Sequence, residues 1–596
     1  MAVETAARAL EGDPGRTIVA LWQSAGAGAD EHPAFLVSEA RGDWREVGWA
    51  EARERVDELA AGFLAHGIEK GDRVAILGRT RLEWTLCDYA LLSIGAVVVP
   101  IYPTSSRDEC AYILADAGAK AVVCEDAEQL ERIAGLDLAA LKLTIAIEDA
   151  AGDVLPLDEV AVRGRAALAD GARERLAEAR AAVAPPDLLT CIYTSGTTGD
   201  PKGCMLTHAN WWSLCESVKQ VEGLMAPGDV AVLFLPLAHN FARLVQFMGA
   251  AAGFTIAFVP DVNKVARALV EVRPTVFPSV PRLYERVYTT MRKRIEQEEG
   301  LKGRLARRSL AVGLQATRLR QAGREPGPLL STQLKVADRL VFSKIQERFG
   351  GRLKHAVSGG APLSAEIIEF FAACGVLILE GYGLTESTSA ASVNRPDRYR
   401  FGTVGPPLPG IEVELADDGE IKLRGDTIFN GYLGRPEATA ETLTDDGWLL
   451  TGDIGTIDAD GFVAIVDRKK ELIVTSGGKK ISPFNLESAL TSSPLIAQAL
   501  VVGDGRTHLA ALVYPDEEEV AKLTGGEKAV QAAVQGVVDG VNATRGPVEQ
   551  IKRFALLPRE FSAEEGEVTP TMKLRRRICE EHFSEEIERL YERGRA

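Results

Sequence analysis

Short apolar runs alternate with amphipathic helical patterns along the first part of the chain. Between Trp49 and His66, apolar residues recur on one helical face and charged residues occupy the other, which predicts a helix. The apolar runs 73–77, 95–100 and 121–124 are predicted to be short buried strands, with a helix over 84–92. This alternation predicts a parallel sheet covered by helices.

The pattern continues beyond residue 188 and then changes in character. A second strand–helix series leads into a predicted helical insert at about 287–349, and residues 403–466 are short strands and turns typical of an antiparallel, barrel-like piece. We therefore predict an α/β multidomain protein. Residues 1–466 form a large N-terminal domain with two βαβ-type sheets and a small β-barrel, and residues 467–596 form a smaller α+β unit.

Composition and charge narrow the class of protein. A chain of 596 residues is too long for a single hydrophobic core, so two or more domains are expected. The net charge of −17 argues against general nucleic-acid binding. The eight cysteines show no CxxC pair and the seven histidines no metal-ligand spacing, which favours a reduced, cytoplasmic location. Neither a signal peptide nor a membrane-spanning run is expected, so any membrane contact would be peripheral, at the inner face. The oligomeric state stays open between monomer and homodimer.

The predicted helical insert contains a basic stretch. Between Arg292 and Arg324 ten Lys or Arg residues stand against three Glu residues. Such a stretch could face the phosphates of coenzyme A or the headgroups of anionic lipids. The favoured alternative is a solvated helical hairpin whose arginines extend along its surface.

A loop rich in glycine and hydroxyl groups follows the predicted strand 188–192, and a helix is predicted over 207–222. Its sequence, Tyr193 to Gly203, offers a flexible backbone, hydroxyl groups and one ammonium group, which suits a polyphosphate. The spacing is not that of a P-loop, and a flexible surface linker is the alternative. The candidate phosphate ligands are Thr194, Ser195, Gly196, Thr197, Thr198 and Lys202.

Further candidates lie downstream. The turn Gly359-Gly360-Ala361 carries little side chain, so a flat ring could lie against its backbone, and Tyr382 could stack on that ring. Thr385 and Glu386 offer the hard oxygen ligands that Mg²⁺ prefers beside nucleotide phosphates. Asp453 suits two ribose hydroxyls, and Arg468 suits ribose or phosphate. Each of these signals alone is weak, because a glycine turn is usually only a turn and an Asp after Gly is usually a cap or turn residue.

Taken together and in this order, these stretches resemble the AMP-forming adenylate superfamily, which comprises acyl-CoA synthetases, adenylation domains of peptide synthetases and beetle luciferases. The resemblance spans roughly residues 45 to 580. The matching residues are Tyr193–Gly203, Gly381–Glu386, Tyr432, Trp448–Asp453, Asp467–Leu472 and Lys573. The resemblance implies two half-reactions, in which a carboxylate attacks MgATP to give an acyl-adenylate and a thiol then displaces AMP.

The resemblance also implies residue roles. Thr194 and Glu386 would hold Mg²⁺, and Lys573 would bridge the carboxylate and the α-phosphate. A mobile C-terminal lid would rotate about a hinge at Asp467–Lys470, and Gly477 and Gly478 would then approach the thiol path. The implied ATP site comprises Thr194, Ser195, Gly196, Thr197, Thr198, Lys202, Gly359, Gly360, Ala361, Gly381, Tyr382, Gly383, Thr385, Asp453, Arg468 and Lys573.

Several details resemble long-chain fatty acid–CoA ligases. His239 would lie beside the acyl carboxylate, and Arg243 stands where one bacterial subgroup carries a gating Trp in the fatty-acid tunnel. The implied partners are therefore ATP, a fatty acid and coenzyme A. Two alternatives stay open. One is a fatty-acyl-AMP ligase that delivers to a carrier protein, and the other is a non-catalytic homologue that holds nucleotide or acyl-CoA.

Overall fold

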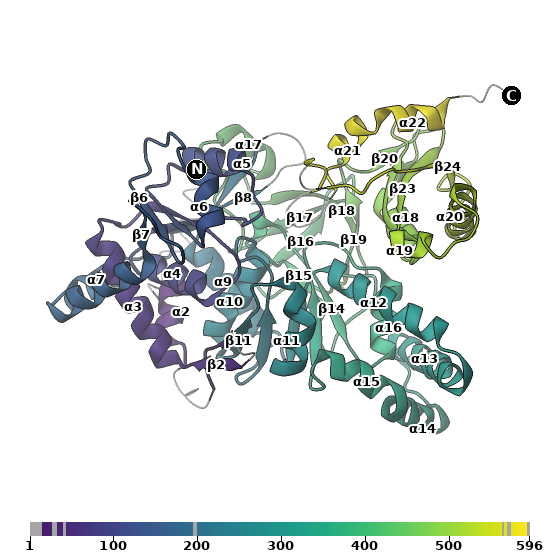
Figure 1. Cartoon of the computed structure of the whole chain (residues 1–596), viewed down its shortest axis with the longest axis horizontal. Helices are drawn as coiled ribbons and strands as arrows, with labels where there is room; N and C mark the ends of the chain where they lie inside the picture. Colours follow the sequence, from purple (N-terminus) through teal and green to yellow (C-terminus); the bar gives the residue numbers. More distant parts are fainter. Residues whose placement is uncertain are drawn as a thin grey trace.

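The computed structural model of the chain describes residues 13, 15–26, 32–39, 43–194, 200–562, 565–568 and 574–592. Two large helix-covered sheets make up most of it, and a smaller group of strands and helices lies to one side of them (Figure 1). The predicted α/β class with a separate C-terminal unit is confirmed. Among the described helices none is long and apolar enough to cross a membrane.

The first sheet has seven strands in the order β7-β6-β5-β3-β4-β8-β9. Its central strands β3 (Arg73–Leu77), β4 (Val97–Ile101) and β5 (Ala121–Cys124) pair in parallel. Because helices cover both faces, these strands are continuous apolar runs, which is the signal that the sequence carries. The others are β6 (Leu143–Ala146), β7 (Leu155–Pro156), β8 (Leu188–Thr194) and β9 (Lys202–Thr207).

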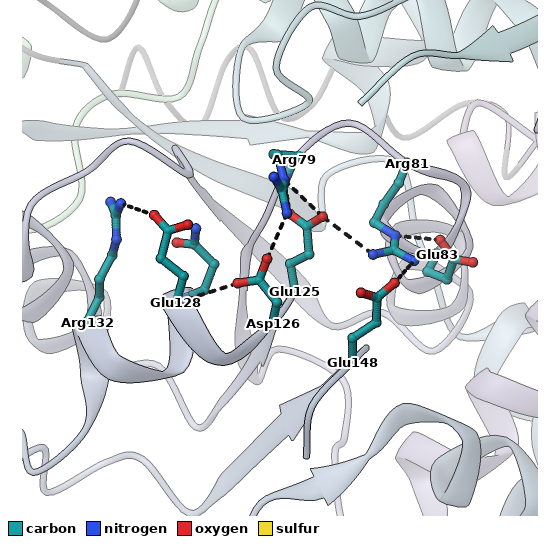
Figure 2. A network of polar contacts seen from close by, with 9 residues as sticks. Arg79, Arg81, Glu83, Glu125, Asp126, Glu128, Arg132 and Glu148 are labelled. Atoms are coloured by element: carbon teal, nitrogen blue, oxygen red, sulfur yellow. Dashed lines mark hydrogen bonds and ion pairs between the residues drawn. The ribbon is translucent and has the colours of Figure 1, made fainter. Parts of the chain in front are cut away.

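A network of ion pairs fills the carboxyl edge of this sheet beside β3 (Figure 2). β4 and β5 lie on opposite sides of β3, an arrangement that opens a ligand crevice in many α/β sheets. Here Glu125, which follows β5 and is buried, pairs with Arg79 at 3.1 Å and Arg81 at 3.4 Å. Asp126 and Glu148 extend the network at 2.7 Å each. These side chains occupy the crevice, so the ligand site is expected elsewhere.

The second sheet has eight strands in the order β15-β14-β13-β12-β10-β11-β1-β2, of which the six from β14 to β1 run parallel. It therefore repeats the strand–helix construction of the first. Its strands are β1 (Phe35–Ser38), β2 (Trp44–Val47), β10 (Val230–Leu233), β11 (Thr255–Phe258), β12 (Val276–Ser279), β13 (His355–Ser358), β14 (Ile378–Tyr382) and β15 (Ser392–Val393).

Helices α4 (Leu82–Ser93) and α10 (Asn240–Ala252) join the two halves of the N-terminal region. Nearly every residue of α4 is buried, as expected for a helix that is apolar on all sides. Arg243 on α10 pairs with Asp88 on α4, and Gln246 Nε2 also donates to Asp88, both at 2.6 Å. The other helices are α2 (Ile18–Ser24), α3 (Trp49–Ala65), α5 (Arg107–Ala117), α6 (Ala127–Ile133), α7 (Leu157–Ala169), α8 (Arg173–Ala181), α9 (His208–Lys219), α11 (Val265–Val272) and α16 (Ala365–Ala373).

The stretch predicted as a helical insert is helical. A Cβ on Gly313 of α13 would lie 2.4 Å from the carbonyl oxygen of Ala373 in α16, so glycine permits close packing and fixes the buried face of α13. The chain turns between α13 and α14, where the sequence 323–328 is rich in Gly and Pro. The insert comprises α12 (Pro281–Gln297), α13 (Gly300–Gln321), α14 (Pro328–Ala337), a π-helical turn (Asp338–Phe342) and α15 (Ser343–Gln346).

A four-stranded antiparallel sheet in the order β16-β17-β18-β19 stands where the barrel-like piece was predicted. The C-terminal unit follows it. The boundary at 466/467 stays a prediction. The strands and helices of both are β16 (Glu412–Leu415), β17 (Glu420–Arg424), α17 (Pro436–Thr442), β18 (Leu449–Ile457), β19 (Val463–Arg468), β20 (Ile473–Val474), β21 (Lys480–Ile481), α18 (Pro483–Thr491), β22 (Ile496–Val502), β23 (Leu509–Pro515), α19 (Glu517–Val520), α20 (Glu527–Asn542), β24 (Ile551–Leu556), α21 (Arg576–His582) and α22 (Ser584–Tyr591).

Candidate active site

The two ends of the predicted phosphate loop are held together by a β-hairpin. Thr194 ends β8 and lies opposite Lys202, the first residue of the antiparallel strand β9. The Thr194 hydroxyl donates to the Lys202 carbonyl at 3.5 Å. The predicted ligands Ser195, Gly196, Thr197 and Thr198 lie outside the described residues. Strand β9 was not predicted. It places Thr194 and Lys202 side by side at the mouth of the loop.

Glu386 lies against this hairpin. Its Oε1 accepts a 2.7 Å hydrogen bond from the Tyr432 hydroxyl, and the Lys202 Nζ stands 5.2 Å from the centroid of the Tyr432 ring. The buried Cys204 thiol of β9 interacts with the side chains of both Thr194 and Glu386. Burial, followed by the Glu386 charge, raises the pKa of Cys204 well above its usual range, so the thiol stays protonated. A hydroxyl, a carboxylate and an ammonium group therefore converge here.

The backbone around Glu386 is tightly constrained. Glu386 occupies a 3₁₀ turn, Thr385–Ser387, and Thr388 follows with a positive φ of 67°. A Cβ on Gly383 would stand only 1.9 Å from the Ser389 carbonyl oxygen, so only glycine fits. Backbone of this kind persists where its surroundings over-determine it, and it fixes the direction in which the Glu386 carboxylate points.

Tyr382, Asp453 and Arg468 form a second polar group. The Tyr382 hydroxyl donates to Asp453 Oδ2 at 2.6 Å, and Arg468 Nε lies 2.8 Å from Asp453 Oδ1. Asp453 and Arg468 are direct cross-strand partners in β18 and β19, which explains why two residues distant in sequence meet. Burial and the Asp453 charge raise the pKa of Tyr382, so its hydroxyl remains a hydrogen-bond donor.

The predicted ring-binding turn and His239 meet at the start of α10. Gly359 follows β13, and a Cβ there would approach the Phe241 ring to 3.3 Å, whereas Gly360 and Ala361 are exposed. His239 caps α10 through its Nδ1, which accepts from the Phe241 N–H at 3.1 Å. The next residue of α10, Asn240, contacts the Thr385 hydroxyl at 3.4 Å. The start of α10 therefore borders the Gly359 turn and the Gly381–Glu386 stretch.

Other predicted residues lie away from this convergence. The Arg243 side chain is fully buried in its pair with Asp88. Gly477 and Gly478 are exposed in the turn between β20 and β21, and Lys470 is exposed as well. Their predicted roles in the acyl or thiol path and in the hinge stay predictions.

The predicted hinge residue Asp467 is already bonded to the C-terminal unit. It is buried, and its Oδ2 accepts from the Ser482 hydroxyl, just before α18. Lys469, two residues later, pairs instead with Asp418 at 2.6 Å and Glu420 at 2.8 Å in the four-stranded sheet. The residue before Arg468 is therefore bonded to the C-terminal unit, and the residue after it is bonded to the four-stranded sheet.

Lys573 lies outside the described residues, but the residues on either side of its segment are described. Val568 and Leu574 form an antiparallel bridge, and the Arg575 N–H donates to the Glu567 carbonyl at 2.7 Å. The Arg575 guanidinium lies 3.6 Å from Glu109 on α5, within the N-terminal region. The C-terminal unit thus meets the N-terminal region close to the position of Lys573 in the sequence.

Helix α5 connects this contact to the phosphate-loop hairpin. The Tyr112 hydroxyl of α5 donates to the Pro201 carbonyl at 3.1 Å, and Asp116 accepts from the Tyr193 hydroxyl at 2.8 Å. Glu109, the partner of Arg575, lies on the same helix as Tyr112 and Asp116. Helix α5 therefore contacts both Arg575 of the C-terminal unit and the base of the hairpin.

Sequence reasoning assigned no role to Glu380, which precedes Gly381 in β14. It is 6% exposed, and its Oε1 accepts from the Leu363 N–H at 3.2 Å, next to the Gly359 turn. Burial raises its pKa to about 7, which the Leu363 N–H only partly opposes. The available signal was a carboxyl group that directly follows the apolar run 376–379.

In the described part of the chain, no three His, Cys, Asp or Glu side chains are grouped so that they could hold a metal ion. Thr194 and Glu386 supply one hydroxyl and one carboxylate. That donor set fits Mg²⁺, which usually takes one or two protein oxygens and completes its shell with substrate phosphates and water.

The same fold occurs in adenylating enzymes of known structure. The adenylation domain of a carboxylate reductase from Mycobacterium chelonae superposes with a TM-score of 0.75 at 24% identity, covering 99% of this chain and 93% of that one. An anthranilate CoA ligase, solved with anthranoyl-AMP, gives 0.70 at 20% identity, covering 95% of this chain and 97% of that one. At these identities the likeness concerns the fold.

The protein family of the chain is identified by comparison of its sequence with known families. Residues 22–433 match the AMP-binding enzyme family and residues 470–595 the AMP-binding enzyme C-terminal domain. The chain belongs to the AMP-binding enzyme family.

Two curated relatives indicate the branch of the family. The long-chain-fatty-acid–CoA ligase FadD15 of Mycobacterium tuberculosis is 36% identical over 568 residues, which are 92% of this chain and 93% of that protein. The long-chain-fatty-acid–CoA ligase ACSBG2 of Xenopus laevis is 30% identical over 607 residues, which are 94% of this chain and 81% of that protein. The resemblance seen in the motifs is therefore confirmed.

Proposed function

We propose that this protein activates a long-chain fatty acid with ATP through an acyl-adenylate and transfers the acyl group to coenzyme A, releasing AMP and pyrophosphate. The observation that carries the proposal is the convergence of two polar groups on the Gly381–Glu386 stretch. One contains Tyr382, Asp453 and Arg468, and the other contains Glu386 beside Thr194 and Lys202. The first suits a ribose and the second a polyphosphate.

The first half-reaction needs charge neutralisation rather than a protein nucleophile. The carboxylate oxygen attacks the α-phosphorus and the bond to pyrophosphate breaks, so negative charge collects on the leaving group. Lys202, which strand pairing places opposite Thr194 at the mouth of the loop, would supply a positive charge, and the loop hydroxyls would supply hydrogen-bond donors. Asp453, ordered by Tyr382 and Arg468, presents a carboxylate fit to accept from ribose hydroxyls.

Glu386 and Thr194 would hold the Mg²⁺ ion that accompanies ATP. The ion, when bound, shields the phosphate charges as pyrophosphate leaves. The Tyr432 hydroxyl fixes one oxygen of Glu386, which orients the carboxylate toward the hairpin.

The C-terminal unit would act as a lid in both half-reactions. Lys573 would reach the α-phosphate during adenylation, and the Arg575–Glu109 contact on α5 supports this position of the lid. Rotation about Asp467–Lys470 would then withdraw Lys573 and bring Gly477 and Gly478 to the thiol path.

The acyl group would enter beside His239, because the start of α10 borders the Gly359 turn. Arg243 lies one turn further along α10, where its pair with Asp88 would set the orientation of this helix at the acyl path. The long-chain class rests on the named activity of the relatives FadD15 and ACSBG2.

The test is a series of straight-chain acids from about two to twenty carbons, incubated with MgATP in the presence and absence of coenzyme A. We expect AMP and acyl-CoA to form together and to rise with chain length toward long acids. Acyl-AMP that accumulates without any thioester would instead identify a fatty-acyl-AMP ligase. Tight nucleotide binding without AMP formation would identify a non-catalytic homologue.

A further inference from the structure

The helical insert carries a concentration of positive charge on an acidic protein. Residues 300–344 contain ten Lys or Arg residues and two acidic ones, in a chain whose net charge is −17. All ten basic side chains are exposed. They are Lys302, Arg304, Arg307, Arg308, Arg318, Arg320, Arg324, Lys335, Arg339 and Lys344.

These charges are available to a partner. Within the described residues Arg318 alone among the ten forms an ion pair, with Glu369 at 3.4 Å. Arg307 instead donates to the carbonyls of Ile295 and Glu298. Arginines that serve a solvated helical hairpin are commonly paired with carboxylates three or four residues away, as Arg292 is with Glu296 on α12. The basic side chains of α13 and α14 lack such partners, so the segment keeps its excess charge.

The same segment exposes large apolar side chains. Twelve large hydrophobic residues are exposed in the described chain, and five of them lie between 301 and 340. Leu301 is 78% exposed and Leu329 is 75% exposed, which are the two highest values among the twelve. Burial of leucine in an apolar environment is favourable, so leaving both in water is costly unless something covers them. The five are Leu301, Leu305, Leu329, Val336 and Leu340.

Helical spacing gathers both kinds of side chain on outward faces. On α13, Leu301, Arg304, Leu305 and Arg308 recur at three- and four-residue intervals, and all four side chains are exposed. Gly313, further along the same helix, packs against α16. Leu329, Val336 and Leu340 recur in the same way along α14 and the π-helical turn, together with Arg339. In Figure 1, α13, α14 and α15 lie together at the lower right edge of the molecule. We call this edge, formed by α13, α14 and α15, the rim (Figure 1), and it is not part of the candidate active site.

A hollow accompanies the rim. It has a volume of about 410 Å³, lies along the second half of α13 and the turn that follows, and combines apolar side chains with two guanidinium groups. Its walls thus offer an apolar surface for a hydrocarbon segment and two guanidinium groups for a phosphate oxygen, of which Arg318 also pairs with Glu369. The lining residues are Ala311, Leu314, Gln315, Arg318, Leu319 and Arg324.

We propose that the face formed by α13, α14 and the π-helical turn docks on an anionic phospholipid bilayer. The phosphates of the headgroups would meet the arginines and lysines, and Leu301, Leu329 and Leu340 would enter the boundary between headgroups and acyl chains. A nucleic acid would satisfy the charges but not the leucines, and the acidic remainder of the protein would repel it. Coenzyme A would meet the charges of the hollow, but it is too small to cover the leucines of two helices.

The test is co-sedimentation of the purified full-length protein with vesicles of phosphatidylcholine alone or with about 30% phosphatidylglycerol, which supplies the negative surface potential. We expect binding to the anionic vesicles only, weakened as salt is raised because the exposed charges are screened. The triple substitution Arg304→Gln/Arg308→Gln/Arg339→Gln should weaken binding by at least about tenfold, since each basic residue contributes at the surface.

A second variant and a matched control separate docking from simple charge attraction. Leu301→Ser/Leu329→Ser/Leu340→Ser keeps every charge and should still lose about fivefold or more, because insertion of apolar side chains supplies part of the binding. The control Val162→Ser/Arg163→Gln removes one exposed apolar and one exposed basic side chain from α7 and should bind like the unaltered protein. Circular dichroism and melting temperature of all three should stay unchanged.

Four outcomes would overturn the proposal. They are equal binding to neutral and anionic vesicles, full binding by either triple variant, loss in the control as large as in the triple variants, and displacement of the protein from vesicles by millimolar coenzyme A. RNA binding of comparable strength that depends on the same arginines and is insensitive to the leucine substitutions would assign the face to a nucleic acid. The vesicle assay needs no catalysis, so it is independent of the proposed function.

Discussion

The Tyr382 hydroxyl donates to Asp453 Oδ2 at 2.6 Å, and this bond joins the end of β14 to the four-stranded sheet. Arg468 holds the other carboxylate oxygen of Asp453 at 2.8 Å. Two neighbours therefore fix the direction of one carboxylate. In the proposed function this carboxylate accepts the ribose hydroxyls of ATP.

Asp453→Asn should weaken ATP binding. Hydrogen bonds to a charged group contribute about 1.5–3 kcal/mol, so KM for ATP should rise about tenfold to a hundredfold while KM for the fatty acid changes little. Steady-state kinetics with each substrate varied in turn measures this split. The control is Asp458→Asn, because Asp458 is paired with Arg400 elsewhere in this part of the chain. An equal rise in both KM values would contradict the ribose assignment.

Glu386→Gln should abolish most adenylation while leaving the fold intact. The substitution keeps the bond to Tyr432 but removes the negative charge beside the hairpin, so fatty-acid-dependent ATP–pyrophosphate exchange should fall by about a hundredfold or more. Glu366→Gln is the matched control, since Glu366 accepts from the Tyr288 hydroxyl at the same 2.7 Å. Comparable exchange activity of the two variants would contradict the assignment of Glu386 as a ligand of Mg²⁺.

Glu380 should make stability depend on pH. Its pKa is raised from 4.5 to about 7 by burial, so the unfolded chain loses the proton first and stability falls as pH rises between those values. A shift of this size corresponds to on the order of 3 kcal/mol. Glu380→Gln stays neutral, so its melting temperature relative to the unaltered protein should rise between pH 5 and about 8. A difference between the two proteins that stays constant over this range would contradict the raised pKa.

Sequence pattern predicted the parts of the fold that depend on local periodicity. The strand predicted over 73–77 is β3, and the helix predicted from Trp49 to His66 is α3, one residue shorter. Strand β9 was missed because Lys202–Thr207 has no alternating pattern, and its pairing with β8 decides its structure. The stretch predicted to be barrel-like forms an open four-stranded sheet in the structure. Whether strands close into a barrel depends on pairing between distant residues, which the local pattern does not show.

The candidate site was predictable as a set of residue types but not as a geometry. Order along the chain indicated Glu386, Asp453 and Arg468, whereas the contacts of Tyr432 with Glu386 and of Tyr382 with Asp453 arise between separate elements. The only sequence signal for Glu380 was its place directly after the apolar run 376–379, because a raised pKa depends on burial in the folded chain.

Arg243 and Asp88 should be strongly coupled. Both side chains are fully buried, and Trp84, Trp211 and Phe247 surround the guanidinium. Arg243→Met leaves the Asp88 carboxylate buried without its cation, which costs about 3–5 kcal/mol.

The double substitution Arg243→Met/Asp88→Leu removes both charges, and we expect it to melt above Arg243→Met alone. Differential scanning calorimetry of the two single variants, the double variant and the unaltered protein gives the coupling energy. Strictly additive losses would show that the pair does not act as a unit.

The most direct test of the account uses Lys573→Ala and compares the two half-reactions. If the C-terminal unit delivers Lys573 only for adenylation, formation of acyl-AMP from a long-chain acid and MgATP should fall by about a thousandfold or more. Conversion of supplied acyl-AMP and coenzyme A to acyl-CoA should stay within about threefold of the unaltered protein. Equal loss in both half-reactions, or no loss in either, would contradict the account.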